Sequence, residues 1–339
     1  MTPSFVFLDT SVLDGQQYNL NSTALVSFIP VAKKHKITLL LPHPTEQEIR
    51  RHIKERAREA LTRLGTAFRE ARKSAPFLTG WEHFPEDVSD KVDEAVRVAL
   101  YEWRLFLGRF NVERLDYEAI NLRDVMHWYD TLTPPFREGK KRKEFPDAFA
   151  LAILAAHAAA TGKIIAVVSE DADFQLACDR YHSLLYFKSL PALTEVLLAD
   201  PSEIEALRAA VLGDPSLLEI GIAIHATESF LSFHIDNRYD VHEWKVAQAR
   251  ITDMRVVALG VGECKVTFEA EIDFEVHLGW SEWDEATEET TSESDWFIET
   301  HPFSGAAKLA LEANKHIRSV PLVSLNEHLV SFEETPRRR

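Results

Sequence analysis

The sequence is poor in cysteine and lacks long apolar runs, and each shortage excludes a class of protein. Its two cysteines, Cys178 and Cys264, are far apart and supply neither a disulfide framework nor, by themselves, a zinc site. No segment approaches the ~20 consecutive apolar residues that span a bilayer. The N-terminal MTPSFVFLDTS has no basic stretch before its short apolar run, so we expect neither a signal peptide nor a membrane anchor. A reducing, cytoplasmic location suits this composition.

Positive charge is also scarce, but the shortage is uneven along the chain. Residues 1–200 contain 26 Lys and Arg against 28 Asp and Glu, whereas residues 201–339 contain 12 against 26. Almost all of the net charge of −16 therefore belongs to the second part, which is a poor candidate for binding phosphates. A chain of 339 residues also exceeds what one hydrophobic core usually organises, so we expect two domains, 1–200 and 201–339.

The first 200 residues alternate between strand-like and helical segments. The strand-like runs are continuously apolar, which is typical of a parallel sheet covered by helices on both faces. A long helical insertion is expected at about residues 50–135, and a further helix runs from Pro146 to Thr161 before Gly162. We therefore predict an α/β domain. The predicted strands are Phe5–Asp9, Ile37–Leu41, Ile164–Ser169 and Leu184–Phe187.

The second part has a different texture. One helix, Glu203–Leu212, precedes a region rich in β-branched and aromatic residues, and Cys264–Val276 alternates apolar with polar side chains. This pattern predicts a smaller, β-rich α+β accessory domain. The acidic segment SEWDEATEETTSESDW is expected to form a mobile loop. An acidic domain of this kind could mimic nucleic acid, mediate self-association or recognise a partner, and the sequence leaves these alternatives open.

Four acidic residues stand where an α/β fold would bring them together. Asp9 ends the first strand and Asp171 follows the IIAVVS strand, so both lie at carboxyl ends of parallel strands, where such folds place their chemistry. Asp147 is in the first turn of the Pro146 helix, and Glu48 opens the helix after LLLP. Each acid alone is equally well explained as a helix cap. Their joint placement favours a functional site.

Four segments, FLDTSVL, LPHPTEQE, PPFREGKKRKEFPDAFALAIL and IIAVVSEDADF, resemble the PIN domain. The resemblance covers residues 4 to about 190 and is nearest to the bacterial branch with a helical insertion and a KKxEFPDA-type motif. It implies a PIN-like parallel sheet and a ribonuclease that depends on Mg²⁺ or Mn²⁺. By position, the resemblance implies metal-binding and catalytic roles for Asp9, Glu48, Asp147 and Asp171, auxiliary roles for Asp173, Ser169 and Ser11, and Glu46 as second choice to Glu48.

The chemistry of crowded carboxylates agrees with this expectation. Several ionised acids repel one another unless cations lie among them, and ligands that are all oxygen select Mg²⁺ or Mn²⁺ over zinc. Two such ions can activate a water, neutralise a scissile phosphate and stabilise the departing oxygen. The acids would then be ligands, with Ser11 or Ser169 orienting a ligand or a water. We assign no catalytic histidine.

A basic run, GKKRK, lies just before Asp147 and could bind phosphates that flank the cut, through Lys140, Lys141, Arg142 and Lys143. We therefore predict a metal-dependent endoribonuclease, of the kind found among toxins and defence effectors. The alternatives are a nucleic-acid-binding or scaffolding module with little turnover, a nuclease acting on DNA, and a phosphatase for small substrates. The expected partner is RNA rather than DNA or a membrane, and the family suggests a homodimer and an inhibitory protein.

Overall fold

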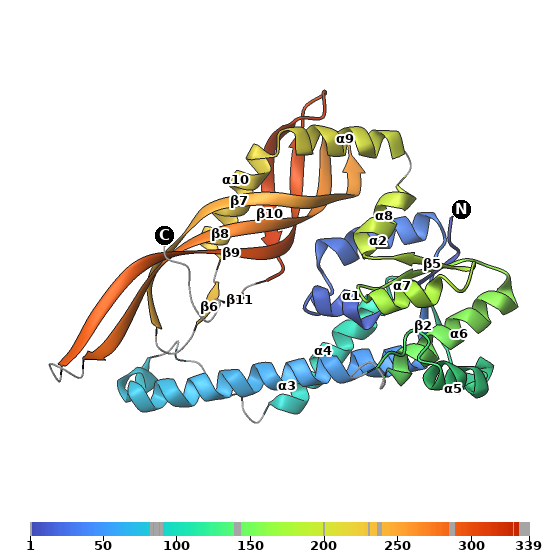
Figure 1. Ribbon diagram of the computed structural model, residues 1–339, viewed down its shortest axis with the longest axis horizontal. Coiled ribbons are helices and arrows are strands. Elements are labelled where there is room, and N and C mark those ends of the chain that lie inside the picture. The colour runs from blue at the N-terminus through green and yellow to red at the C-terminus, as the bar shows by residue number, and fades with distance from the viewer. Residues whose placement is uncertain are drawn as a thin grey trace. The chain divides into compact units, whose positions relative to one another are not determined.

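The computed structural model contains two compact units, Met1–Leu193 and Thr194–Arg339, each with its own sheet and hydrophobic core (Figure 1). In the described part of the chain, no helix is both long enough and apolar enough to cross a membrane. The structure describes residues 2–81, 84, 88, 91–138, 144–198, 201–229, 231–235, 239–284, 289–327 and 329–331.

The first unit is built on a sheet of five parallel strands in the order β3-β2-β1-β4-β5. The central strands are buried almost throughout, as their continuous apolar sequences predict, and Val6 of β1 pairs with Leu39 of β2 and Ala166 of β4. The α/β class is therefore confirmed. The strands are β1 Phe5–Leu8, β2 Thr38–Pro42, β3 Asn111–Leu115, β4 Ile165–Val168 and β5 Leu184–Phe187.

Helices surround this sheet, and α6 contributes most to its core. Leu151 and Leu154 of α6 pack with Phe7 of β1 and Val167 of β4, and all four side chains are fully buried. Gly162 ends α6 with φ +64°, a left-handed conformation that favours glycine. The helices are α1 Thr10–Gly15, α2 Thr23–Lys34, α3 His43–Ser74, α4 Val92–Leu107, α5 Leu122–Asp130, α6 Phe145–Thr161, α7 Ala172–Cys178 and α8 Leu190–Leu197, with 3₁₀ turns at Pro76–Gly80 and Tyr117–Ala119.

The expectation that residues 50–135 form a helical insertion is only partly correct. The segment contains α3, α4 and α5, but it also supplies β3, which pairs with β2 at the edge of the central sheet. The sequence of β3, NVERL, has neither an apolar run nor buried residues. A five-residue edge strand of this kind is formed by its pairing partner rather than by its own hydrophobic pattern, so it could not be predicted from the residues of β3 alone.

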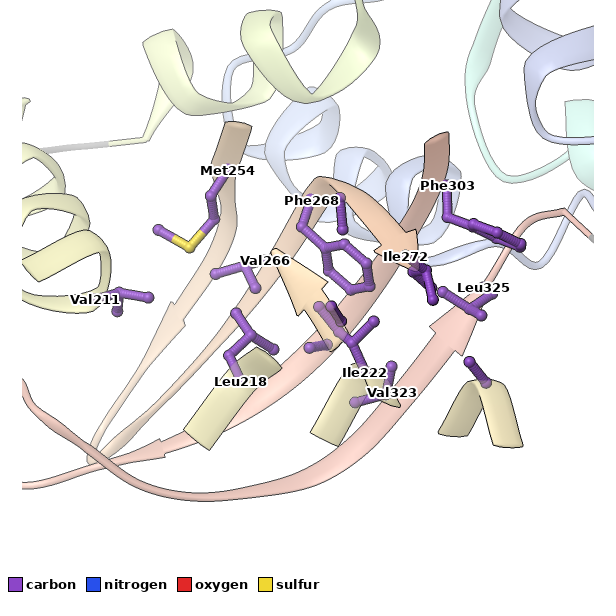
Figure 2. Packing of buried hydrophobic residues seen from close by; sticks show 14 of the residues in the cluster. Val211, Leu218, Ile222, Met254, Val266, Phe268, Ile272, Phe303, Val323 and Leu325 are labelled. Carbon is purple, nitrogen blue, oxygen red and sulfur yellow. The ribbon is translucent and has the colours of Figure 1, made fainter. Parts of the chain in front are cut away.

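The second unit packs two helices on a sheet of four antiparallel strands in the order β10-β9-β8-β7. Leu218 and Ile222 of α10 meet Val266 and Phe268 of β8 in its core (Figure 2). Gly221 allows this approach, because a Cβ there would come within 3.3 Å of Val320. The elements are α9 Pro201–Gly213, α10 Ser216–Glu228, β6 Ser232–His234, β7 Tyr239–Gly260, β8 Glu263–Asp284, β9 Glu289–Leu311, β10 Ile317–Leu325 and β11 Leu329–Ser331.

Two features of this unit differ from the sequence-based expectation. The acidic segment predicted as a mobile loop is instead paired on either side of residues 285–288, which lie outside the described residues, because β8 continues to Asp284 and β9 begins at Glu289. The backbone N–H and C=O groups of the two facing strands bond to each other whatever the charge of the side chains. Helix α10 was not predicted, since its sequence is apolar on nearly every side and rich in isoleucine, which is equally typical of a strand.

β7 differs from its neighbours in carrying an extra residue at regular intervals. Its register with β8 shifts four times, at positions five residues apart, so that 22 residues of β7 lie opposite fewer residues of β8. Each shift is a β-bulge, which bends the strand and increases its twist. The unpaired residues are His242, Ala247, Thr252 and Val257.

Candidate active site

Asp9 and Asp171 lie at the same edge of the parallel sheet. Asp9 follows β1 directly, and its backbone N–H donates to the carbonyl of Val168, the last residue of β4. Asp171 comes three residues after β4 and caps α7, where its Oδ1 accepts from the backbone N–H of Asp173 at 2.8 Å. Because β1 and β4 are adjacent and parallel, their carboxyl ends present both acids to one region.

Two hydroxyl groups fix the Asp9 carboxylate. Ser11 Oγ and Ser169 Oγ both donate to Asp9 Oδ2, at 2.5 and 2.8 Å. The same hydroxyls accept from backbone N–H groups, Ser11 from Glu170 and Ser169 from Asp171, each at 3.1 Å. Asp9 is only 5% exposed. The two serines therefore orient a buried carboxylate and connect it to the backbone that carries Asp171.

Glu48 and Asp147 complete a group of acids that act on one another. Burial, together with the negative charges of Asp9, Glu144 and Glu48, raises the pKa of Asp147 to about 9. Burial also raises the pKa of Glu48; the charges of Asp9 and Glu144 act in the same direction, while His52 and Arg51 oppose them. These mutual effects bring Asp9, Glu48 and Asp147 into one electrostatic site.

Glu144 is a member of this site that sequence reasoning missed. It caps α6 and shares a hydrogen bond with the Asp147 carboxyl. The signal was present in the KRKEFPDA segment, because a glutamate three residues before Asp147 lies about one helical turn away.

Asp171 joins the site through Tyr186 and Ser169. The Tyr186 hydroxyl donates to the Ser169 carbonyl at 2.7 Å. Burial raises the pKa of Tyr186, and the charges of Asp171 and Asp9 both raise it further. Asp171 is thus near Asp9.

The model of the PIN domain family matches residues 6–174 of this chain. This part of the chain is a PIN domain. PIN domains are generally nucleases that act on nucleic acids and typically use divalent metal ions. No curated protein and no solved structure gives a match.

Within the PIN domain, Glu46 is held apart from the acid group. Its carboxylate accepts from Arg114 Nε of β3 at 3.0 Å and lies 3.9 Å from Arg50. Residues two positions apart on a helix differ by about 200° around its axis, so Glu46 and Glu48 face opposite sides of α3. The ion pair with Arg114 ties α3 to the edge strand, and Glu48 is the residue that faces the other acids.

Asp173 is also engaged elsewhere. It is 3% exposed and forms an ion pair with Arg137. Its backbone N–H donates to Asp171 Oδ1, so Asp173 supports the position of Asp171 beside the acid group. The basic residues Lys140, Lys141, Arg142 and Lys143 lie outside the described residues.

The acid group fits a divalent cation in its chemistry. No three Asp, Glu, His or Cys side chains in the described segments are already arranged as a finished metal site. The donors are nevertheless all oxygen, which suits Mg²⁺ or Mn²⁺. Burial and the nearby negative charges raise the pKa of Asp147, and a bound cation would oppose both effects by favouring the ionised carboxylate.

Proposed function

We propose that this protein is a metal-dependent endoribonuclease whose ligands are Asp9, Glu48, Asp147 and Asp171. The observation that supports this most directly is the mutual electrostatic effect of Asp9, Glu48 and Asp147, which come from three separate elements. A fold gains no stability from gathering like charges in a partly buried place. Such a group is typical of a site that functions with bound cations.

The residues of this site have distinct tasks in the proposed reaction. Asp9 is held in one orientation by Ser11 and Ser169, so its carboxylate is preorganised to bind a cation. Asp147 and Glu48 supply oxygen ligands from two helices. Divalent ions, when bound, supply Lewis acidity toward a phosphodiester and a water. Glu144, through its hydrogen bond to Asp147, positions that carboxyl and adds negative charge to the site.

The proposal is tested by comparing cleavage of labelled single-stranded RNA and DNA by the full chain with Mn²⁺, Mg²⁺ or EDTA. We expect cutting of RNA that EDTA abolishes. The substitutions Asp9→Asn and Asp147→Asn keep side-chain size and remove charge, and each should lower the rate at least a hundredfold. The matched control is Glu102→Gln, which changes an exposed acid on α4 and should leave the rate unchanged.

Each other outcome identifies an alternative. Binding of RNA without cutting, in wild type and variants alike, would favour a scaffolding module. Cutting confined to DNA would replace the substrate class while keeping the site. Activity that survives in the Asp9→Asn/Asp147→Asn double variant would show that these acids are the wrong residues.

A further inference from the structure

A strained turn beside the acid group directs an aromatic side chain toward α3. Helix α1 ends in two consecutive residues with positive φ, Gln17 at +49° and Tyr18 at +58°. Two backbone hydrogen bonds close the helix end, from Gln17 to the carbonyl of Asp14 and from Tyr18 to that of Leu13, in the pattern that usually employs glycine. Left-handed backbone costs roughly 1–2 kcal/mol for each such residue. Helix capping explains the positive φ of Gln17 but not that of Tyr18.

Tyr18 takes part in a polar network with two residues of α3. Its hydroxyl lies 3.0 Å from Nδ1 of His52, and the same nitrogen is 3.4 Å from Asp14 Oδ2. Arg56 donates from Nη2 to Asp14 Oδ1 at 3.0 Å, and its guanidinium lies over the Tyr18 ring, 5.1 Å from the centroid. Asp14 and Tyr18 of the α1 region therefore orient both His52 and Arg56.

This network begins one helical turn from a proposed ligand. His52 is four residues after Glu48, on the same face of α3 and about 6 Å further along the axis, and Arg56 is about 12 Å along. Side chains of a helix lean toward its N-terminus, so His52 leans toward Glu48. The charge of His52 acts on Glu48, lowering a pKa that burial raises. The network and the acid group thus form one continuous surface of the first unit.

We propose that Arg56 and His52, held by Asp14 and Tyr18, form a subsite that binds the backbone phosphate next to the scissile one. This inference rests on the proposed nuclease function. The Arg56 side chain is 47% exposed and His52 is 26% exposed, so both can reach a ligand. A guanidinium already oriented by a carboxylate and an aromatic ring presents its remaining N–H groups in a fixed fork, which matches phosphate oxygens.

A purely structural role would predict something different. An Asp14–Arg56 pair that only joined α1 to α3 would require neither a histidine between them nor a strained tyrosine. The spacing of Glu48 and His52 also suits a strand of nucleic acid, because one helical turn along α3 is comparable to the separation of neighbouring phosphates in an extended strand. The inferred ligand is therefore a phosphodiester of the substrate and not a separate small anion.

Binding in EDTA tests the subsite without cleavage. The full chain is titrated against a labelled single-stranded RNA at several KCl concentrations between 50 and 200 mM. Loss of one phosphate contact in Arg56→Gln should weaken binding roughly tenfold and reduce the slope of log K against log salt by about 0.7. The matched control is Arg63→Gln, an exposed arginine on α3 that also pairs with a carboxylate, that of Glu59 at 4.0 Å. It should leave affinity and slope unchanged.

A chemical change in the substrate separates phosphate binding from a structural effect. Neutral methylphosphonate linkages are placed one at a time beside the cut, and cleavage by wild type, Arg56→Gln and His52→Gln is compared. At one flanking position the neutral linkage should slow wild type about tenfold, and there the penalty of Arg56→Gln should disappear. Arg56→Lys, which keeps the charge, should restore most of the salt slope.

The outcomes distinguish failure of the subsite from failure of the function. If wild type neither binds nor cuts RNA or DNA, the proposed function is wrong and the subsite falls with it. If wild type cuts, but Arg56→Gln and His52→Gln match Arg63→Gln on every linkage, only the subsite is overturned. Thermal melting of each variant shows that it is folded.

Discussion

Replacing Asp147 with asparagine should stabilise the metal-free protein while removing its activity. The pKa of this carboxyl is raised from 3.8 to about 9 in the folded chain. Between these two pH values the folded state holds a proton that the unfolded state releases. The contribution of Asp147 to stability is therefore fully present below pH 3.8 and is lost as the pH rises toward 9. Between pH 3.8 and pH 7 this carboxyl lowers the free energy of unfolding by at most about 4 kcal/mol. Asparagine does not titrate and avoids this loss.

The assay is thermal or urea unfolding of wild type and Asp147→Asn in EDTA at pH 5, 6, 7 and 8. We expect the variant to be more stable by about 1–4 kcal/mol at pH 7, or by roughly 2–4 °C in melting temperature for each kcal/mol in a unit of this size. Its advantage should grow with pH by up to about 1.4 kcal/mol per unit. Mg²⁺ or Mn²⁺ should stabilise wild type more than the variant, because a bound ion favours the folded state.

The Glu102→Gln variant, changed at an exposed site, serves as the control and should follow wild type at every pH. An Asp147→Asn protein that is less stable than wild type at pH 8 in EDTA would refute the reasoning. So would an advantage that does not change with pH, since that would reflect packing rather than the buried charge.

Three further predictions concern parts of the fold outside the acid group. Glu46→Gln should lower the free energy of unfolding in urea by about 1–3 kcal/mol, because it leaves Arg114 without its carboxylate. Cleavage should persist in this variant, and a loss of cleavage as large as that of Glu48→Gln would contradict the separation of the two glutamates. The thiols of Cys178 and Cys264, whose pKa values burial raises to about 12, should react with Ellman's reagent at pH 8 only after unfolding, and rapid labelling of the native chain would contradict this. Gly305→Ala should destabilise the second unit by more than about 2 kcal/mol, because its Cβ would come 2.4 Å from a carbonyl oxygen of the adjacent strand, and a neutral effect would be inconsistent with this packing.

The sequence predicted those parts of the first unit whose residue types indicate burial or a helix boundary. Buried strands such as Phe5–Leu8 are apolar throughout, and Asp9 and Asp171 stand directly beyond two of them, so their shared edge follows from parallel topology. Pro146 and Gly162 bracket α6 for local steric reasons. Where neighbouring residues in the sequence determine the local structure, that structure could be predicted from the sequence.

Other features depend on partners that are distant in sequence. The polar strand Asn111–Leu115 exists because β2 offers it a ladder, and the acidic strands that meet near Asp284 and Glu289 pair despite a composition typical of loops. Glu144 is the exception, because it lies only three residues before Asp147 and was missed although the KRKEFPDA segment contained the signal. The network around Tyr18 could not be predicted, because the residues with positive φ in its turn, Gln17 and Tyr18, are not glycines.

The regular bulges of β7 affect how readily another strand could pair with the edge of its sheet. β7 has 22 residues, roughly 70 Å of extended chain, and lies at the edge of the four-stranded sheet in the described part of the molecule. A flat edge of that length is a template for any passing strand. An extra residue every fifth position interrupts the run of donors and acceptors before a foreign strand can match it. The bulges thus leave this long edge strand without the regular ladder of donors and acceptors that a second strand would need, and deleting Thr252 would remove one of these interruptions.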